Sequence, residues 1–70
     1  MLRFPATQAR RVLRALLRIG WVIVRQEGSH KILAKEGYKD YVFAFHDSVE
    51  IPPYLLKMIA QKTGLRPEDL

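Results

Sequence analysis

The chain has 70 residues, a formal net charge of +5 and no cysteine. A chain of this length buries only about 60% of the surface that its unfolded form exposes, so we expect one hydrophobic core and a single domain over residues 1–70. The lack of cysteine excludes a disulfide framework, and with His30 and His46 as the only histidines a zinc cluster is excluded as the source of stability.

Neither a signal peptide nor a membrane span is expected from the sequence. Residues 1–8 lack the apolar core of a secretory signal, and no stretch approaches the roughly 18 apolar residues that a membrane helix needs. We therefore expect a cytoplasmic protein without membrane contacts.

The positive charge is concentrated in the first half of the chain. Residues 1–35 contain eight basic residues and one acidic residue, whereas residues 36–70 contain four basic and six acidic residues. One face of the molecule should therefore be strongly positive. Nucleic acids and acidic protein surfaces are the natural partners of such a face.

The first predicted element is an amphipathic helix over residues 6–18. Its apolar residues recur at helical spacing, and Gly20 follows as a stop signal. Arg10, Arg14 and Arg18 lie four residues apart and form a stripe on the opposite helix face. Contact with phosphates and a solubilising role are both open interpretations of this stripe.

Three short strands and a second helix follow. We expect strands over residues 21–25, 30–35 and 41–45, separated by turns at 26–29 and 36–39. Pro52 and Pro53 can open the second helix, and Gly64 can cap its end. The predicted fold is α+β, with the order α-β-β-β-α and both helices on one face of an antiparallel sheet. This order and size match the double-stranded RNA-binding fold class.

His30 is the first candidate for a catalytic residue. It begins the second predicted strand and directly follows Gly28 and Ser29. If side chains alternate along this strand and Leu33 packs in the core, His30 faces outward. Proton-transfer catalysis and a surface position without a role are both compatible with such a residue.

The other candidates near His30 are weaker. His46 ends the third predicted strand and either assists His30 or simply terminates the strand. Ser29 points away from the neighbouring histidine, so it is a poor nucleophile and a better phosphate ligand or turn residue. Gly28 is expected to adopt a positive φ or to leave room for a ligand. A metal site formed by His30, His46 and Asp47 matches no known ligand spacing, so we expect no metal and no other cofactor.

The aromatic residues also have two interpretations. They either stack on nucleic-acid bases or belong to the core of this small domain, which is the commoner use of aromatic side chains. The residues concerned are Trp21, Tyr41, Phe43 and Phe45.

Several short segments together resemble the HicA family. They are Gly20-Trp21, the run Arg25-Gln26-Glu27-Gly28-Ser29-His30-Lys31, Phe45-His46, and Ile51-Pro52 ahead of a helix that ends at Gly64-Leu65. The resemblance covers roughly residues 6–65. HicA proteins are small messenger-RNA interferase toxins of type II toxin-antitoxin pairs, with a fold like that of double-stranded RNA-binding domains.

The resemblance implies an endoribonuclease in which His30 is the catalytic residue. RNA cleavage without a metal needs proton transfer and positive charge, and the 2′-OH of the RNA can act as the nucleophile. We expect the RNA backbone to be bound by Gly28, Ser29 and Lys31 of the Gly-Ser-His turn together with Arg25, Arg10, Arg14 and Arg18. The second proton-transfer group is His46, Lys31 or water.

The family also implies an antitoxin resembling HicB as protein partner and mRNA as target. Two alternatives use the same basic face without catalysis. One is a non-catalytic RNA-binding module, and the other is an interaction domain that docks an acidic partner.

Overall fold

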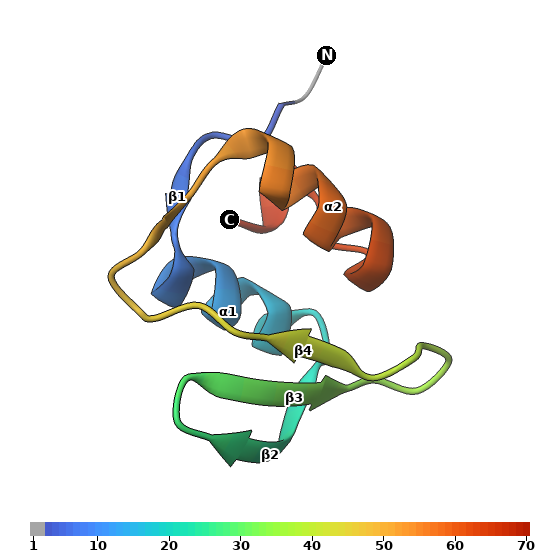
Figure 1. The fold of residues 1–70 in the computed structure, drawn as a ribbon. Helices are drawn as coiled ribbons and strands as arrows, with labels where there is room; N and C mark the ends of the chain where they lie inside the picture. The colour runs from blue at the N-terminus through green and yellow to red at the C-terminus, as the bar shows by residue number, and fades with distance from the viewer. Residues whose placement is uncertain (1–2) are drawn as a thin grey trace.

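Two helices and a three-stranded antiparallel sheet form most of the computed structural model, which describes residues 3–70 (Figure 1). In chain order the elements are β1 (Thr7–Gln8), α1 (Ala9–Arg18), β2 (Val22–Glu27), β3 (His30–Ala34), β4 (Tyr41–Phe43), β5 (Glu50–Ile51), α2 (Pro53–Thr63) and the 3-10 helix η1 (Pro67–Asp69). The predicted α+β class is confirmed. The first two residues of the expected 1–70 domain, Met1 and Leu2, lie outside the described residues. Among residues 3–70, no helix has both the length and the apolar character for a membrane span.

The sheet has the strand order β2-β3-β4, which makes β3 its central strand. β2 and β3 form a hairpin with a two-residue loop, Gly28 and Ser29, because Glu27 pairs with His30. Gly28 has a φ of 58°. A glycine with positive φ at the first position of a two-residue loop is typical of a type II′ turn. The expected positive φ is therefore confirmed, although β2 continues two residues further than predicted.

β2 contains a bulge. Ile23 lies opposite Leu33, but the next residue with a partner is Arg25, opposite Ile32, so that Val24 is an extra residue in the strand. A bulge shifts by one residue which side chains point to each face of a sheet. Ile23 therefore lies on the same face as Leu33, and Arg25 lies on the other face with Ile32.

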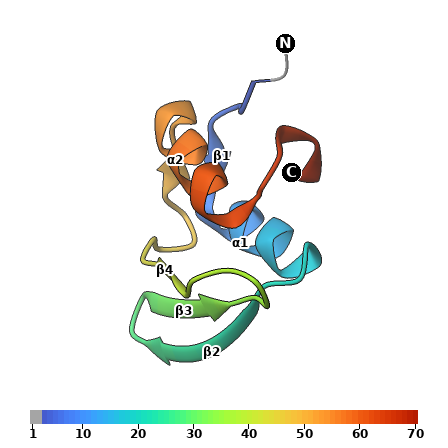
Figure 2. The ribbon, with the colours of Figure 1, turned by 90° about the vertical axis from the view of Figure 1, so that its right-hand side faces the viewer.

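Both helices pack on the same face of the sheet, and α1 lies nearer to it (Figures 1 and 2). Leu33 of β3 and Phe43 of β4 are 0% and 1% exposed, and they are the sheet residues at the centre of the core. The other buried apolar residues come from both helices and from the segments before, between and after them. They are Phe4, Ala9, Val12, Ala15, Leu16, Trp21, Ile51, Leu56, Ile59 and Leu65.

The aromatic residues belong to this core. Trp21 and Phe43 are fully buried, and Tyr41 and Phe45 pack half-buried against the same cluster. The indole Nε1 of Trp21 donates a hydrogen bond of 3.1 Å to the carbonyl oxygen of Thr63 in α2. These positions confirm that the four aromatic side chains pack in or against the core.

The predicted start of the first helix is wrong. α1 begins at Ala9 and not at Ala6, because the two residues before it form β1 and pair antiparallel with β5. The N–H groups of Ala9 and Arg10 donate to the carbonyl oxygens of Val49, at 2.7 Å, and Asp47, at 3.1 Å. The unpaired N–H groups of a helix start must find acceptors, and here the loop before β5 provides two of them.

Other boundaries differ by smaller amounts. β4 ends at Phe43, so that His46 lies in the loop after the strand and does not end the strand itself. The segment between His46 and the second helix is not entirely a loop, because Glu50 and Ile51 form β5. The predicted second helix is confirmed, with Pro53 as its first residue and Gly64 as a left-handed cap with φ of 77°.

Candidate active site

His30 is the first residue of β3, and its side chain is exposed. Leu33, three residues further along the strand, is fully buried under the helices. Because side chains alternate along a strand, His30 points to the opposite face of the sheet. Its outward orientation agrees with the expectation from the sequence.

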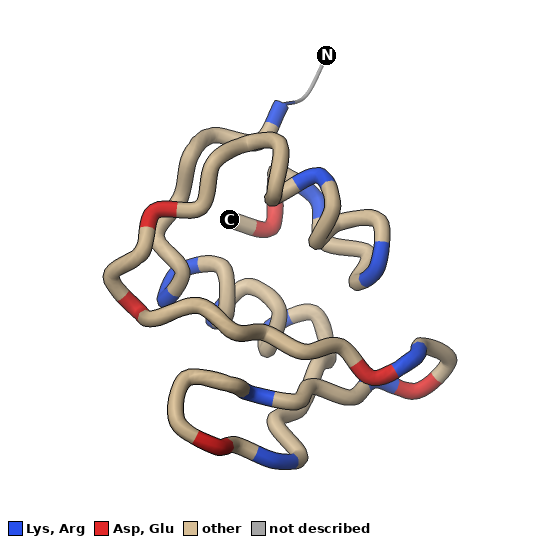
Figure 3. Tube along the Cα trace, viewed as in Figure 1, with Lys and Arg blue, Asp and Glu red and all other residues tan. Residues whose placement is uncertain are grey.

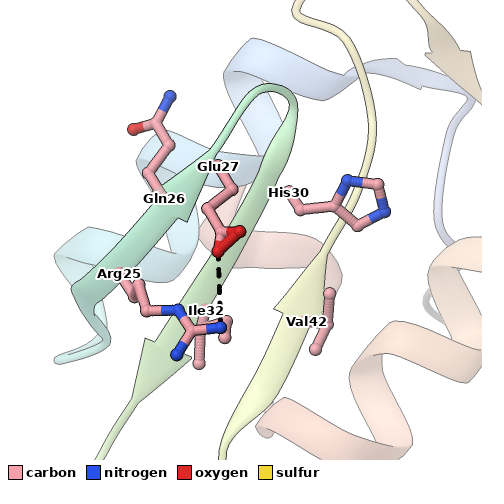
Figure 4. Close-up of a pocket in the computed structure, with 6 residues that line it drawn as sticks. All are labelled: Arg25, Gln26, Glu27, His30, Ile32 and Val42. Carbon is pink, nitrogen blue, oxygen red and sulfur yellow. Dashed lines mark ion pairs between the residues drawn. The ribbon is translucent and has the colours of Figure 1, made fainter.

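His30 lies on the face of the sheet that is turned away from both helices. We call it the open face. The cross-strand partners on it are Glu27 with His30, Arg25 with Ile32, and Ile32 with Val42. Figure 4 shows these side chains on the viewer's side of the sheet, with α1 behind it. The open face is therefore defined by Arg25, Glu27, His30, Ile32 and Val42.

These residues surround a cavity of about 310 Å³, the first cavity, to which Gln26 also contributes. The aliphatic side chains of Ile32 and Val42 lie at the sheet surface, and the charged and titratable side chains come from the β2–β3 hairpin (Figure 4). An apolar base with a few polar groups around it is the usual composition of a binding site for a small group. A phosphate with part of its nucleotide is of suitable size.

An ion pair joins two residues of the first cavity. Nη2 of Arg25 lies 3.4 Å from Oε2 of Glu27, and the two side chains are 68% and 71% exposed. Ion pairs this exposed contribute little to stability. Both charged groups therefore remain open to a ligand in the cavity.

A second cavity of about 470 Å³ lies at the tip of the β2–β3 hairpin, on the other side of β3. Lys31 pairs with Phe43, whose side chain faces the helices, so Lys31 points away from the open face. The residues that line this second cavity come from the hairpin tip and the loop after β4, and they are Gly28, Ser29, Lys31, Phe45, His46 and Asp47.

The Gly-Ser-His-Lys segment is thus divided between two cavities. His30 lines the first cavity with Arg25, and Ser29 and Lys31 line the second cavity with His46. The structure brings together the two sequence-distant candidates Lys31 and His46. It does not place either of them with His30.

The predicted arginine stripe lies elsewhere. Arg10, Arg14 and Arg18 are exposed on α1, which packs against the sheet on the face opposite to His30. Nη2 of Arg18 donates a 2.6 Å hydrogen bond to the backbone oxygen of Asp69, so this arginine also holds the C-terminal turn. Figure 3 shows basic residues along α1, at the β2–β3 hairpin and along α2. The positive charge therefore covers several surfaces, and of the basic residues within 3–70 only Arg25 lines the cavity of His30.

Glu27 is the functional candidate that sequence reasoning missed. A regular strand would place Glu27 and Arg25 on the same face as Ile23, under the helices. The two-residue turn pairs Glu27 with His30 and Arg25 with Ile32, so both residues lie on the open face, and the extra residue Val24 returns Ile23 to the helix-facing side. The predicted turn over residues 26–29 placed Glu27 outside the strand, so its pairing with His30 was not expected.

Comparison with known proteins supports one family. No curated protein matches the chain. The family model described as the HicA toxin of bacterial toxin-antitoxin matches residues 9–65, from the first residue of α1 to the residue after the cap of α2. The matched segment contains both cavities and most of the 70 residues. The chain therefore belongs to the HicA toxin family of bacterial toxin-antitoxin systems.

Proposed function

We propose that this toxin is an endoribonuclease that cleaves mRNA, with His30 as a proton-transfer catalyst. The observation that carries the proposal is the exposed imidazole of His30 in a cavity beside the guanidinium of Arg25, within the segment that matches the family. Histidine exchanges protons near neutral pH, and a fixed cation stabilises the extra charge of a phosphate transition state.

RNA itself supplies the nucleophile of this reaction. The 2′-OH attacks the neighbouring phosphorus, so the enzyme needs groups that move protons and hold the phosphate. His30 moves a proton, and Arg25 faces the same cavity with its charge exposed. Cleavage by this route is restricted to RNA, because DNA lacks the 2′-OH.

The second cavity is suited to the RNA backbone on either side of the cleaved bond. Lys31 provides a cation there, and Ser29 provides a hydroxyl group. Gly28 forms the turn without a side chain, and His46 faces these residues from the loop after β4. A strand of RNA that passes over the hairpin tip would contact both cavities. The α1 arginines, Arg10, Arg14 and Arg18, would add contacts to more distant phosphates.

The proposed reaction takes place in the cytoplasm, where mRNA is the substrate, and it requires neither a metal nor another cofactor. The protein partner is an antitoxin resembling HicB. Such a partner would block cleavage by covering the open face, and acidic residues on it would speed association with this basic chain.

Purified protein incubated with a long mRNA transcript tests the proposed function. We expect His30→Ala to lower the cleavage rate by about 10²–10⁴-fold, the usual contribution of a proton-transfer group. His46→Ala is the matched control, because it removes a histidine from the second cavity. At saturating RNA this variant should keep most of the cleavage rate, because the second cavity serves RNA binding and not proton transfer, and a chelator should leave the wild-type rate unchanged.

Three results would contradict the proposal or a part of it. Intact RNA with salt-sensitive binding would identify a non-catalytic RNA-binding module. Absence of both cleavage and binding would favour a domain that only docks an acidic protein. Loss of activity on chelation would overturn the metal-independent mechanism while leaving the nuclease assignment intact.

A further inference from the structure

We propose that Glu27 is a second catalytic residue and acts as the general base, with His30 as the general acid. This inference rests on the proposed function, since it names the partner that a single histidine needs in RNA cleavage. One group must accept the proton of the 2′-OH while another donates a proton to the leaving oxygen. The first cavity contains one carboxylate and one imidazole in adjacent positions.

The position of Glu27 is set by the sheet. Glu27 and His30 are direct cross-strand partners at the end of the β2–β3 hairpin. Side chains of such partners project to the same face, with Cβ atoms about 5 Å apart. The closing turn, Gly28-Ser29, holds the two residues in this register. Figure 4 shows the carboxylate of Glu27 turned toward Arg25 and the imidazole of His30 pointing away from it. Both side chains are exposed, so a change of rotamer would let them contact a phosphate placed between them.

The other candidates for the second role do not share this geometry. Lys31 projects to the opposite face of β3, and His46 lines the second cavity with it. Arg25 lies in the first cavity, but a guanidinium stays protonated in proteins and cannot act as a base. Gln26 carries an amide and has no proton to exchange at neutral pH. Glu27 is therefore the one side chain of the first cavity that can accept a proton alongside His30.

The positive charge of Arg25 lies in the same cavity as the proposed base and acid. The guanidinium of Arg25 lies 3.4 Å from the carboxylate of Glu27, so a phosphate bound beside them would meet a cation and a base at once. At neutral pH a glutamate is ionised and ready to accept a proton, while a histidine can carry one. The cavity thus holds a base, an acid and a cation for the transition state.

The chemical step balances without any co-reactant. O2′ of the RNA attacks phosphorus as its proton passes to the carboxylate of Glu27. The bond from phosphorus to O5′ breaks, and the imidazolium of His30 gives its proton to O5′. The products are a 2′,3′-cyclic phosphate and a 5′-OH end. In the hydrolysis of the cyclic phosphate, His30 takes a proton from water and Glu27 returns its proton to O2′, which restores both groups.

Glu27→Gln tests this role, since it keeps the size of the side chain and removes the base. We expect the single-turnover cleavage rate at saturating protein to fall by about 10²–10⁴-fold. RNA affinity should stay the same or rise, because one negative charge is lost. Glu36→Gln is the matched control, since Glu36 is exposed in the turn between β3 and β4 and outside both cavities.

An unchanged cleavage rate in Glu27→Gln would contradict the inference. If Glu27 is only a counter-ion that neutralises Arg25, Glu27→Gln would cleave at the wild-type rate or faster, and the inference would be overturned. Circular dichroism of the variant checks that it is folded. A wild type that does not cleave RNA would refute the proposed function. A wild type that needs His30 but tolerates Glu27→Gln would refute the role of Glu27 alone.

Discussion

His30 and Lys31 are neighbours in the chain and lie on opposite faces of β3. His30 is paired with Glu27 on the open face, and Lys31 is paired with Phe43 on the helix-facing side. Strand alternation produces this separation directly. In the proposed enzyme, proton transfer and backbone binding therefore belong to adjacent residues that contact different parts of the RNA.

Lys31→Ala should consequently weaken RNA binding without stopping the chemical step. Loss of one phosphate contact reduces the slope of log affinity against log salt by about 1. We expect a higher KM with kcat nearly unchanged, measured by cleavage kinetics and by RNA binding at several salt concentrations. Lys39→Ala, at an exposed position outside both cavities, is the control for loss of one charge. A fall in kcat as large as that of His30→Ala would show that Lys31 takes part in proton transfer.

At the scale of elements, the two-residue turn decides what surrounds His30, and the bulge in β2 lies further along the strand. Val24 is the extra residue, and beyond it Arg25 and Glu27 lie on the open face. Val24 is 57% exposed and has no partner in the β2–β3 ladder. Removing it would leave Ile23 next to Arg25, and these two residues would still alternate between the faces.

Deletion of Val24 should therefore preserve the site. The shortened strand can pair in regular register with every other residue on its present face. We expect His30-dependent cleavage within a few-fold of wild type and a thermal unfolding midpoint only a few degrees lower. Deletion of Gln26, which has a partner in Lys31, should abolish cleavage because it shifts Arg25 relative to Glu27 and breaks the hairpin register. Equal effects of the two deletions would contradict this explanation.

The β2–β3 hairpin also marks the limit of what the sequence predicted. Regular periodicity and turn residues were sufficient for both helices, the three strands of the sheet and the outward direction of His30. The β1–β5 pair was missed because two-residue strands have no periodicity and depend on contacts between distant segments. The grouping of Glu27 with His30 was missed because the turn was predicted over residues 26–29, which left Glu27 outside the strand, whereas the turn in the structure has only two residues, Gly28 and Ser29.

At the scale of the whole molecule, Trp21 connects the layers. It follows α1, precedes β2 and is 2% exposed in the core. Its indole N–H donates to the carbonyl oxygen of Thr63, the last residue of α2. The last carbonyls of a helix lack partners within the helix, so this bond satisfies one of them. The same side chain thus orients both helices relative to the sheet that carries His30.

Trp21→Phe should lower stability without changing the chemistry. The variant leaves the buried carbonyl of Thr63 without its donor, and a buried polar group without a partner costs about 1–3 kcal/mol. We expect a loss of about 2 kcal/mol in the free energy of unfolding, measured with urea, and normal cleavage rates well below the unfolding temperature. Val22→Ala, at a position that is 58% exposed, should cost less than about 0.5 kcal/mol. Equal losses in the two variants would contradict a connecting role for Trp21.

The central claim is that a toxin of this family acts through the imidazole of His30, and induced expression in bacteria tests it most directly. Growth and the integrity of cellular mRNA are followed after induction of the wild type beside His30→Ala, with both proteins shown to accumulate in folded form. We predict growth arrest and fragmented mRNA with the wild type, and normal growth with intact mRNA for the variant. Arrest with fragmentation by both proteins, or by neither, would contradict the claim.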